Sequence, residues 1–237
     1  MPLEDISIPS PRDTIVREIE SQIIRGKLRP GEKLPTEREL AAQTGASKTV
    51  VHFALIELER LGFVKIVPRQ GVYAADYART GNAETLNEVL RFNGGRLNYK
   101  MAVELVELRN GIEGGALIRL AEHHTDEDLA VLRAVLDELK AARDADLGIP
   151  ETAEIESRFH YLIIERSGND MFALVMNSFS RLTELVWQYC EMYWGVDGFI
   201  EHDERLLSLA AGGAGHAARD YIECIFKEFL AVWEKLQ

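Results

Sequence analysis

The chain has 237 residues, of which 46% are hydrophobic and 28% charged. This length and apolar content suffice for one large domain or two ordinary ones, and they exclude a chain that is disordered overall. No apolar run of about eighteen residues occurs, and residues 1–11 lack a basic start and an apolar core. We therefore expect a cytoplasmic protein with no membrane span. Two cysteines, Cys190 and Cys224, are too few for a disulfide framework, and neither belongs to a C-x-x-C pair that would indicate structural zinc or thiol redox chemistry.

The net charge of −12 argues against a chain that simply coats nucleic acid, but the charge is unevenly distributed. Residues 1–79 contain twelve Lys or Arg and eleven Asp or Glu, a net charge of +1, so residues 80–237 carry −13. The small, polar run from Arg79 to Ala83 is typical of a linker. We therefore expect two domains, residues 1–79 and 80–237.

The first domain begins with three predicted helices. Ile15, Ile19 and Ile23 are spaced four apart and predict a helix over 14–25. Thr36 and Glu39 have the spacing of a capping box and predict a second helix that ends near residue 44. A third helix follows the predicted cap Ser47 and ends at Gly62; its apolar stripe is Val51, Ala54, Leu55, Leu58 and Leu61. Two short helices joined by a tight turn predict a helix-turn-helix.

A β-hairpin is predicted after the third helix. Residues 63–67 and 72–75 are short β-rich runs, and residues 68–71 form the turn between them. Together with the helices, this hairpin predicts a winged helix-turn-helix.

The outward face of the third helix carries Lys48, Thr49 and His52 near its N-terminus, where helices in the major groove present side chains to base edges. Phe53 and Ile56 share this face and either touch a thymine methyl or pack against a neighbouring element. Basic groups at Lys33, Arg38 and Arg69 are predicted to meet phosphates and so fix the register on DNA.

The run from Gly31 to Ala41, together with 45–55, 61–64 and 69–73, resembles the winged helix-turn-helix of GntR-type bacterial transcription regulators. In that family the arginine matching Arg38 holds operator DNA, and arginines stand where this chain has Lys48 and His52. Lysine imitates the bidentate contact of arginine with guanine only partly, and histidine does not, so an altered operator preference is expected. The predicted DNA-binding residues are Lys33, Arg38, Ser47, Lys48, Thr49, His52, Arg69, Gln70 and Gly71.

The second domain shows helical stripes and no strand pattern, which predicts an all-α bundle of roughly six or seven helices with room for a ligand between them. Three pieces resemble the FCD effector-binding domain of the FadR branch of the same family: Glu107-Leu108-Arg109 with Glu113, residues 159–169, and Glu201-His202 with the following helix pair. The resemblance implies a homodimer on a palindromic operator, with repression or activation controlled by a small-molecule effector.

Many FCD domains hold a divalent metal through Asp and three histidines. Here Glu156 stands in the Asp place, four residues before His160, and His202 matches the second histidine. The third histidine is missing: an ungapped count from His202 puts Cys224 in its place, whereas an alignment on Ala217-Ala218-Arg219 puts Ile225 there. The candidate ligands for zinc or a similar ion are therefore Glu156, His160, His202 and Cys224.

The effector remains open between two classes. The run 167–178 resembles fatty-acyl-responsive members, which implies Arg109 as a contact for acyl-CoA or a fatty acid, while many other relatives sense small organic acids. An aromatic-rich set either lines a long apolar cavity or forms core or dimer contacts: Trp187, Tyr189, Tyr193, Trp194, Phe226, Phe229 and Trp233. The predicted effector-binding residues are Arg109, Glu156, His160, Asn169 and His202.

The alternative functions are a metal-dependent helical-bundle enzyme and a metal-sensing regulator. Against the enzyme, the chain has no paired E-x-x-H motifs in matching helices, no G-x-S-x-G elbow, no P-loop and no dinucleotide fingerprint. We therefore expect no catalytic residues.

Overall fold

The computed structural model describes residues 10–236, which form two compact units that divide between Gly95 and Arg96. The division lies sixteen residues beyond the expected boundary between residues 79 and 80. Among the described residues, no helix combines the length and the apolar character that crossing a membrane requires.

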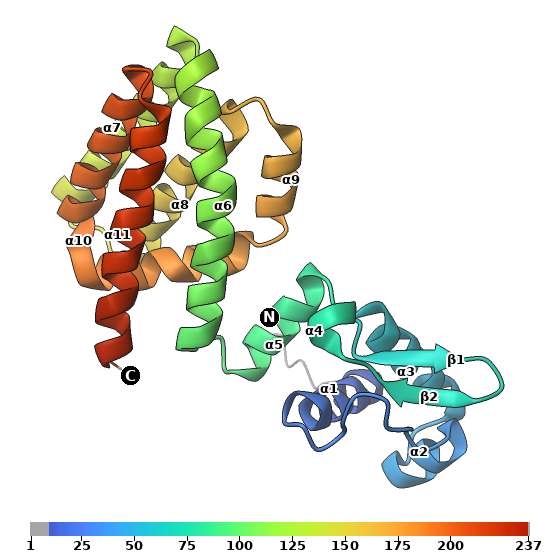
Figure 1. The fold of residues 1–237 in the computed structure, drawn as a ribbon. Coiled ribbons are helices and arrows are strands. Elements are labelled where there is room, and N and C mark those ends of the chain that lie inside the picture. The colour runs from blue at the N-terminus through green and yellow to red at the C-terminus, as the bar shows by residue number, and fades with distance from the viewer. Residues whose placement is uncertain (1–9, 237) are drawn as a thin grey trace, which may run out of the picture. The chain divides into compact units, whose positions relative to one another are not determined.

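The first unit consists of helices and one small sheet (Figure 1). Its elements are α1 (Pro11–Ile24), α2 (Glu37–Thr44), α3 (Lys48–Arg60), β1 (Val64–Val67), β2 (Gly71–Ala74), α4 (Tyr77–Thr80) and α5 (Ala83–Phe92). The predicted winged helix-turn-helix is confirmed in this order of elements. Helix α1 starts three residues earlier than predicted because the Ser10 hydroxyl accepts a hydrogen bond from the amide of Asp13 (3.1 Å).

The two predicted caps of the helix-turn-helix are present. The Thr36 hydroxyl accepts from the amide of Glu39 (3.3 Å), and the Glu39 carboxylate accepts from the amide of Thr36 (2.8 Å). Ser47 caps α3 by accepting from the amide of Val50 (3.3 Å). These local hydrogen bonds satisfy end amides that have no partner inside a helix, so they determine where α2 and α3 begin.

Strands β1 and β2 pair antiparallel, with Val64 opposite Ala74 and Val67 opposite Gly71. The strands lie within one residue of the predicted runs. Arg69, at the tip of the hairpin, adopts a positive φ of 64°. The hairpin therefore presents residues 68–70 to solvent.

Helix α5 belongs to the first unit, which is why the unit ends later than expected. The amide nitrogen Nδ2 of Asn82 donates to the carbonyl oxygen of Arg60 (3.0 Å), and the Thr85 hydroxyl donates to that of Leu61 (2.6 Å). The predicted linker packs equally closely. Gly62 has φ +75°, and a Cβ there would lie 2.7 Å from the carbonyl oxygen of Thr80. Residues 79–83 therefore form part of the packed domain.

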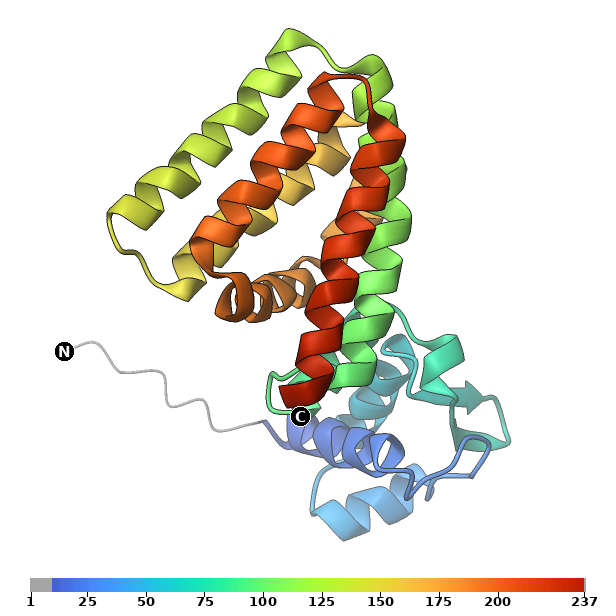
Figure 2. The same ribbon diagram turned by 60° about the vertical axis from the view of Figure 1, so that its left-hand side comes forward.

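The second unit is an all-α bundle, as predicted (Figure 2). Its helices are α6 (Tyr99–His123), α7 (Asp126–Asp144), α8 (Ile149–Arg166), α9 (Asp170–Asn177), α10 (Ser180–Ala211) and α11 (Gly215–Leu236). Helices α6 and α11 run side by side along much of their length. Helix α10 is kinked at Gly195, whose φ of 67° and ψ of 171° lie outside the helical region.

Aromatic side chains fill the interior of this bundle. Trp187 is 1% exposed and contacts Phe226 and Phe199, with ring centroids 5.4 and 6.0 Å apart. Phe229 and Trp233 are also buried, with ring centroids 5.3 Å apart. These aromatic residues are core side chains that pack on one another, so they do not line an open apolar cavity.

Candidate functional site

The first candidate site is the outward face of α3. The predicted stripe on this helix is buried, whereas Lys48, Thr49 and His52 are exposed. The side chains of Phe53 and Ile56 are 55% and 43% exposed. No described residue of the chain therefore covers these two apolar side chains fully.

His52 has a partner that the sequence pattern did not indicate. Its Nδ1 lies 2.8 Å from Oε1 of Glu37, at the start of α2. Both side chains are about half exposed. The contact links the two helices of the helix-turn-helix and restricts the orientation of the imidazole.

The remaining predicted DNA contacts lie on α2, at the cap of α3, in the segment before α2 and on the β-hairpin. Arg38, on α2, and Arg69 and Gln70, at the hairpin tip, are exposed. Lys33 pairs with Tyr73 in a short bridge, and its Nζ lies 5.9 Å from the centre of that ring. The hydroxyl of Ser47 caps α3 by accepting from the amide of Val50. Gly71 lies against the Lys33 side chain.

The charge on this unit is balanced. Residues 1–95 contain thirteen Lys or Arg and thirteen Asp or Glu, so the whole charge of −12 falls on residues 96–237. A neutral unit has little long-range attraction for DNA, so its binding depends on specific contacts.

The second candidate site is a buried polar cluster in the bundle, formed by Arg109 and Glu113 of α6, Glu156 and His160 of α8, and Asp203 of α10. Arg109 donates to Glu113 (2.7 Å), whose other oxygen hydrogen-bonds with Nδ1 of His160. On the opposite side of the ring, Nε2 lies 3.2 Å from Glu156 and 3.6 Å from Asp203. All five side chains are at most 3% exposed.

The charges in this cluster determine one another's protonation. Burial raises the pKa of Asp203 well above its usual range, and the neighbouring Glu156 carboxylate adds to the effect. Burial alone would lower the pKa of His160, but Glu113 and Glu156 raise it. Burial would likewise raise the pKa of Glu113, but His160 and Arg109 lower it. The ring also stacks on Trp187, with centroids 4.2 Å apart.

A divalent metal fits three of these residues. Glu156, His160 and Asp203 each offer a ligand atom, and these atoms lie within 4.8 Å of one another. Oε2 of Glu156 and both carboxylate oxygens of Asp203 are buried with no hydrogen-bonding partner in the described structure. Glu113 contacts Nδ1 of His160 and leaves Nε2 facing the two carboxylates; metal-binding histidines commonly use one nitrogen for the ion while a carboxylate holds the other.

The structure places the other two predicted ligands elsewhere. His202 directs Nδ1 to the hydroxyl of Tyr221 (2.8 Å), and its neighbour Asp203 faces the cluster instead. Cys224 is exposed, and its thiol donates to Glu228 (3.7 Å). The sequence placed His202 and Asp203 side by side, and only the rotation of α10 decides which of the two points inward.

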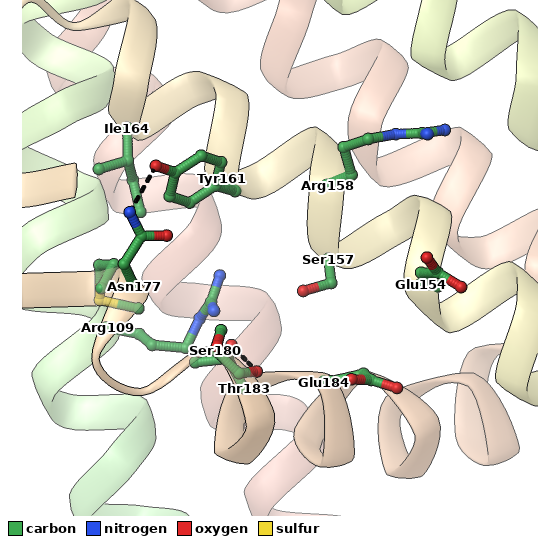
Figure 3. Close-up of a pocket in the computed structure, with 11 residues that line it drawn as sticks. Arg109, Glu154, Ser157, Arg158, Tyr161, Ile164, Asn177, Ser180, Thr183 and Glu184 are labelled. Carbon is green, nitrogen blue, oxygen red and sulfur yellow. Dashed lines mark hydrogen bonds between the residues drawn. The ribbon is translucent and has the colours of Figure 1, made fainter. Parts of the chain in front are cut away.

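A small cavity of about 220 Å³ lies beside the cluster (Figure 3). Its lining residues are mostly of polar type, but the surface that they present to the cavity is mostly apolar: Arg109, Glu154, Ser157, Arg158, Tyr161, Ile164, Met176, Asn177, Ser180, Thr183 and Glu184. Asn177 donates to the hydroxyl of Tyr161 (2.9 Å) at one edge. Arg109 both lines the cavity and contacts Glu113, so it joins the two sites. The predicted effector residue Asn169 is not among the lining residues; it caps α9 by accepting from the amide of Met171 (3.1 Å).

Comparison with known proteins relates both units to bacterial regulators. The family model described as "Bacterial regulatory proteins, gntR family" matches residues 11–74, and the FCD domain model matches residues 104–227. The HTH-type transcriptional regulator LutR of Bacillus subtilis (strain 168) is 27% identical over 203 residues, covering 83% of this chain and 89% of LutR. The Uxu operon transcriptional regulator of Escherichia coli (strain K12) is 30% identical over 167 residues, covering 70% of this chain and 62% of that regulator.

A solved structure supports the fold. It is described as "Lar controls the expression of the Listeria monocytogenes agr system and mediates virulence", and it superposes with a TM-score of 0.59 at 18% identity over all of both chains. At this identity the similarity supports only the fold, that is, the arrangement of the helices and strands.

Proposed function

Because the chain belongs to the gntR family of bacterial regulatory proteins and carries an FCD domain, we propose that this DNA-binding transcription regulator acts as a cytoplasmic homodimer on a palindromic operator. The family relationship identifies a regulator and not an enzyme. The observation that carries the DNA contact is the exposed face of α3, where Lys48, Thr49 and His52 are free of core packing.

The dimer proposal rests on the size and charge of a single DNA-binding unit. A single α3 helix spans one half-site, and the first unit carries no net charge to strengthen its binding. Two copies related by a two-fold axis would place their helices in successive major grooves, about 34 Å apart. Specific affinity then arises from two simultaneous half-site contacts.

For the effector, the cavity favours a small organic acid over acyl-CoA or a fatty acid. At about 220 Å³ it is smaller than the usual range for drug-sized ligands. Arg109 is the cation that favours a carboxylate here, because its Nε is buried without a hydrogen-bonding partner in the described structure, whereas Arg158 is paired with Glu138. Trp187 itself is packed against other core side chains and is 1% exposed, so it is not open to an acyl chain in the described structure.

The buried cluster suits a resident divalent cation such as zinc. Glu156, His160 and Asp203 would hold it, and the bound ion would supply a fixed positive charge inside the buried cluster. In the chain itself, Glu113 orients the imidazole of His160, and Arg109 neutralises Glu113. The cluster thereby connects a ligand in the cavity to three different helices.

Regulation requires that the effector bind two arrangements of the dimer with different affinity. The shared residue Arg109 is the structural reason to expect such coupling, since a ligand that recruits its guanidinium changes its contact with Glu113. That change would alter packing between α6 and α8, which carry the cluster.

A band-shift assay tests the proposal. The probe is the intergenic DNA beside the protein's own gene, and the additions are small hydroxy or dicarboxylic acids in one series and long-chain acyl-CoA in the other. We expect a shift that only the small acids change. Absence of any shift contradicts the operator proposal, whereas a shift that responds only to acyl-CoA contradicts the effector proposal.

A pair of variants locates the response. Ser157→Gln extends a side chain into the cavity wall and should abolish the response to the acid while DNA binding persists. Ser208→Gln makes the same change at an exposed position of α10 that does not line the cavity, and should respond like the original protein. Equal responses in both variants would place the effector elsewhere.

Metal sensing is the second candidate, and the three convergent donors favour it. In the same assay, zinc added to protein stripped with a chelator should then change the band shift without any organic acid. No change on addition of zinc would contradict metal sensing.

A further inference from the structure

The contact between His52 and Glu37 determines which nitrogen of the imidazole can donate. A carboxylate only accepts hydrogen bonds, so the 2.8 Å contact with Oε1 of Glu37 requires a proton on Nδ1 of His52. In the neutral imidazole the other nitrogen, Nε2, then carries a lone pair. The side chain of His52 is 53% exposed on the outward face of α3, so Nε2 is accessible to a hydrogen-bond donor.

Base pairs differ in what they offer to such an acceptor. In the major groove adenine presents its N6 amino group and cytosine its N4 amino group, whereas guanine presents the acceptors O6 and N7. An acceptor at Nε2 pairs with an amino group and repels the edge of guanine. This preference is the opposite of the guanine preference of an arginine at the same place.

The neighbouring side chain adds a second element of recognition. Phe53 follows His52 directly on α3, is 55% exposed, and has its ring centroid 6.1 Å from that of the imidazole. The apolar group that a major groove offers to such a ring is the C5 methyl of thymine. The two side chains together therefore suit an amino-bearing base beside a thymine.

We propose that His52, held by Glu37 with Nε2 as an acceptor, selects adenine or cytosine and rejects guanine at one operator position, and that Phe53 reads the methyl of an adjacent thymine. The proposal rests on the proposed contact of this face with operator DNA. Glu37 acts as a positioning residue, because it touches the imidazole and not the base.

Selection from a randomised duplex library at about pH 8, where histidine side chains are generally neutral, measures the base preference. The original protein should prefer adenine or cytosine at one position of each half-site. His52→Ala should lose that preference by about two-fold to ten-fold, which is the range for a single neutral hydrogen bond, and His52→Arg should turn it to guanine. Arg38→Ala, an exposed α2 cation, is the matched control and should weaken binding to all sequences equally.

Two further measurements separate the parts of the proposal. Glu37→Gln should blur the preference at the same position, because an amide can accept from the ring or donate to it. Replacing the adjacent thymine by deoxyuracil removes only the methyl; it should weaken the original protein and leave Phe53→Ala unaffected.

The outcomes distinguish failure of the contact from failure of the tautomer. An unchanged preference profile in His52→Ala means that His52 does not face a base, which contradicts the proposed contact itself. A His52-dependent preference for guanine in the original protein keeps the contact and overturns the acceptor role of Nε2. A preference that survives in Glu37→Gln at full strength overturns the positioning role of Glu37.

Discussion

The buried carboxyl of Glu20 should make the stability of the first unit depend on pH. Glu20 lies on α1, is 4% exposed, and has one oxygen without a hydrogen-bonding partner among the described residues. Its other oxygen accepts from Arg91 of α5 (3.1 Å). Burial raises the pKa of Glu20 to about 7; the nearby Glu88 carboxylate adds to the shift, and Arg91 opposes it.

The sign follows from proton binding in the two states. The folded unit holds the Glu20 proton up to about pH 7, whereas a carboxyl with the ordinary glutamate pKa of 4.5 has lost it well below that pH. The folded state therefore binds more protons between these values, and the free energy of unfolding falls as the pH rises through them. A shift from 4.5 to about 7 corresponds to at most about 3 kcal/mol, at 1.36 kcal/mol for each pKa unit.

Glu20→Gln removes the titrating group while it keeps the shape of the side chain. We expect the loss of stability between about pH 5 and pH 8 to shrink by about 1–3 kcal/mol in this variant. Glu18→Gln, at an exposed position on the same helix, should keep the pH dependence of the original protein.

Hydrogen exchange of the amides of α1, corrected for the intrinsic exchange rate at each pH, measures this effect in the full chain. Tryptophan fluorescence is unsuitable because Trp187, Trp194 and Trp233 all lie in the second unit. An equal pH dependence of protection in Glu20→Gln and the original protein would refute the reasoning, because ionisation of Glu20 would then leave the free energy of unfolding of the first unit unchanged.

Three other substitutions test the structure. Gly62→Ala should lower the free energy of unfolding by more than about 2 kcal/mol in urea denaturation, because a Cβ there clashes with backbone atoms and the residue has a positive φ. Gly26→Ala is the control: this position also has a positive φ but open space around it, so the free energy of unfolding should fall by only about 1 kcal/mol. Trp187→Ala should cost about 3–5 kcal/mol, and an unchanged Tm would show that it is not a core residue. Asp203→Asn should reduce the metal content of protein purified without a chelator or metal-affinity tag, whereas Cys224→Ser should not; equal contents would contradict the ligand assignment.

Local signals in the sequence were reliable. The capping box of Thr36 and Glu39, the cap at Ser47 and the buried stripe of α3 all appear where the spacing predicts them. These features depend on residues three or four apart, whose relative positions are set once a helix forms. The spacing of Glu156 and His160 likewise predicted that both lie on one helix face, and both are buried in the cluster.

Contacts between distant segments were not readable from the sequence. The extension of the first unit to Gly95 depends on hydrogen bonds from α5 to the end of α3, which no local pattern indicates. The link between Glu37 and His52 joins two helices across fifteen residues. Such contacts arise only when helices pack against one another, so the spacing of residues along the chain does not predict them.

The sequence by itself determined the class of fold, the outward face of α3 and the pairing of Glu156 with His160 on one face of a bundle helix. Only the tertiary structure decided that Asp203 and not His202 joins Glu156 and His160, because the helix beyond the kink at Gly195 turns one of two adjacent side chains inward. It also decided that Trp187, Phe226, Phe229 and Trp233 are core residues and that a small cavity lies beside Arg109. The physical reason is that helix periodicity fixes which residues share a face, whereas packing against other helices decides what that face meets.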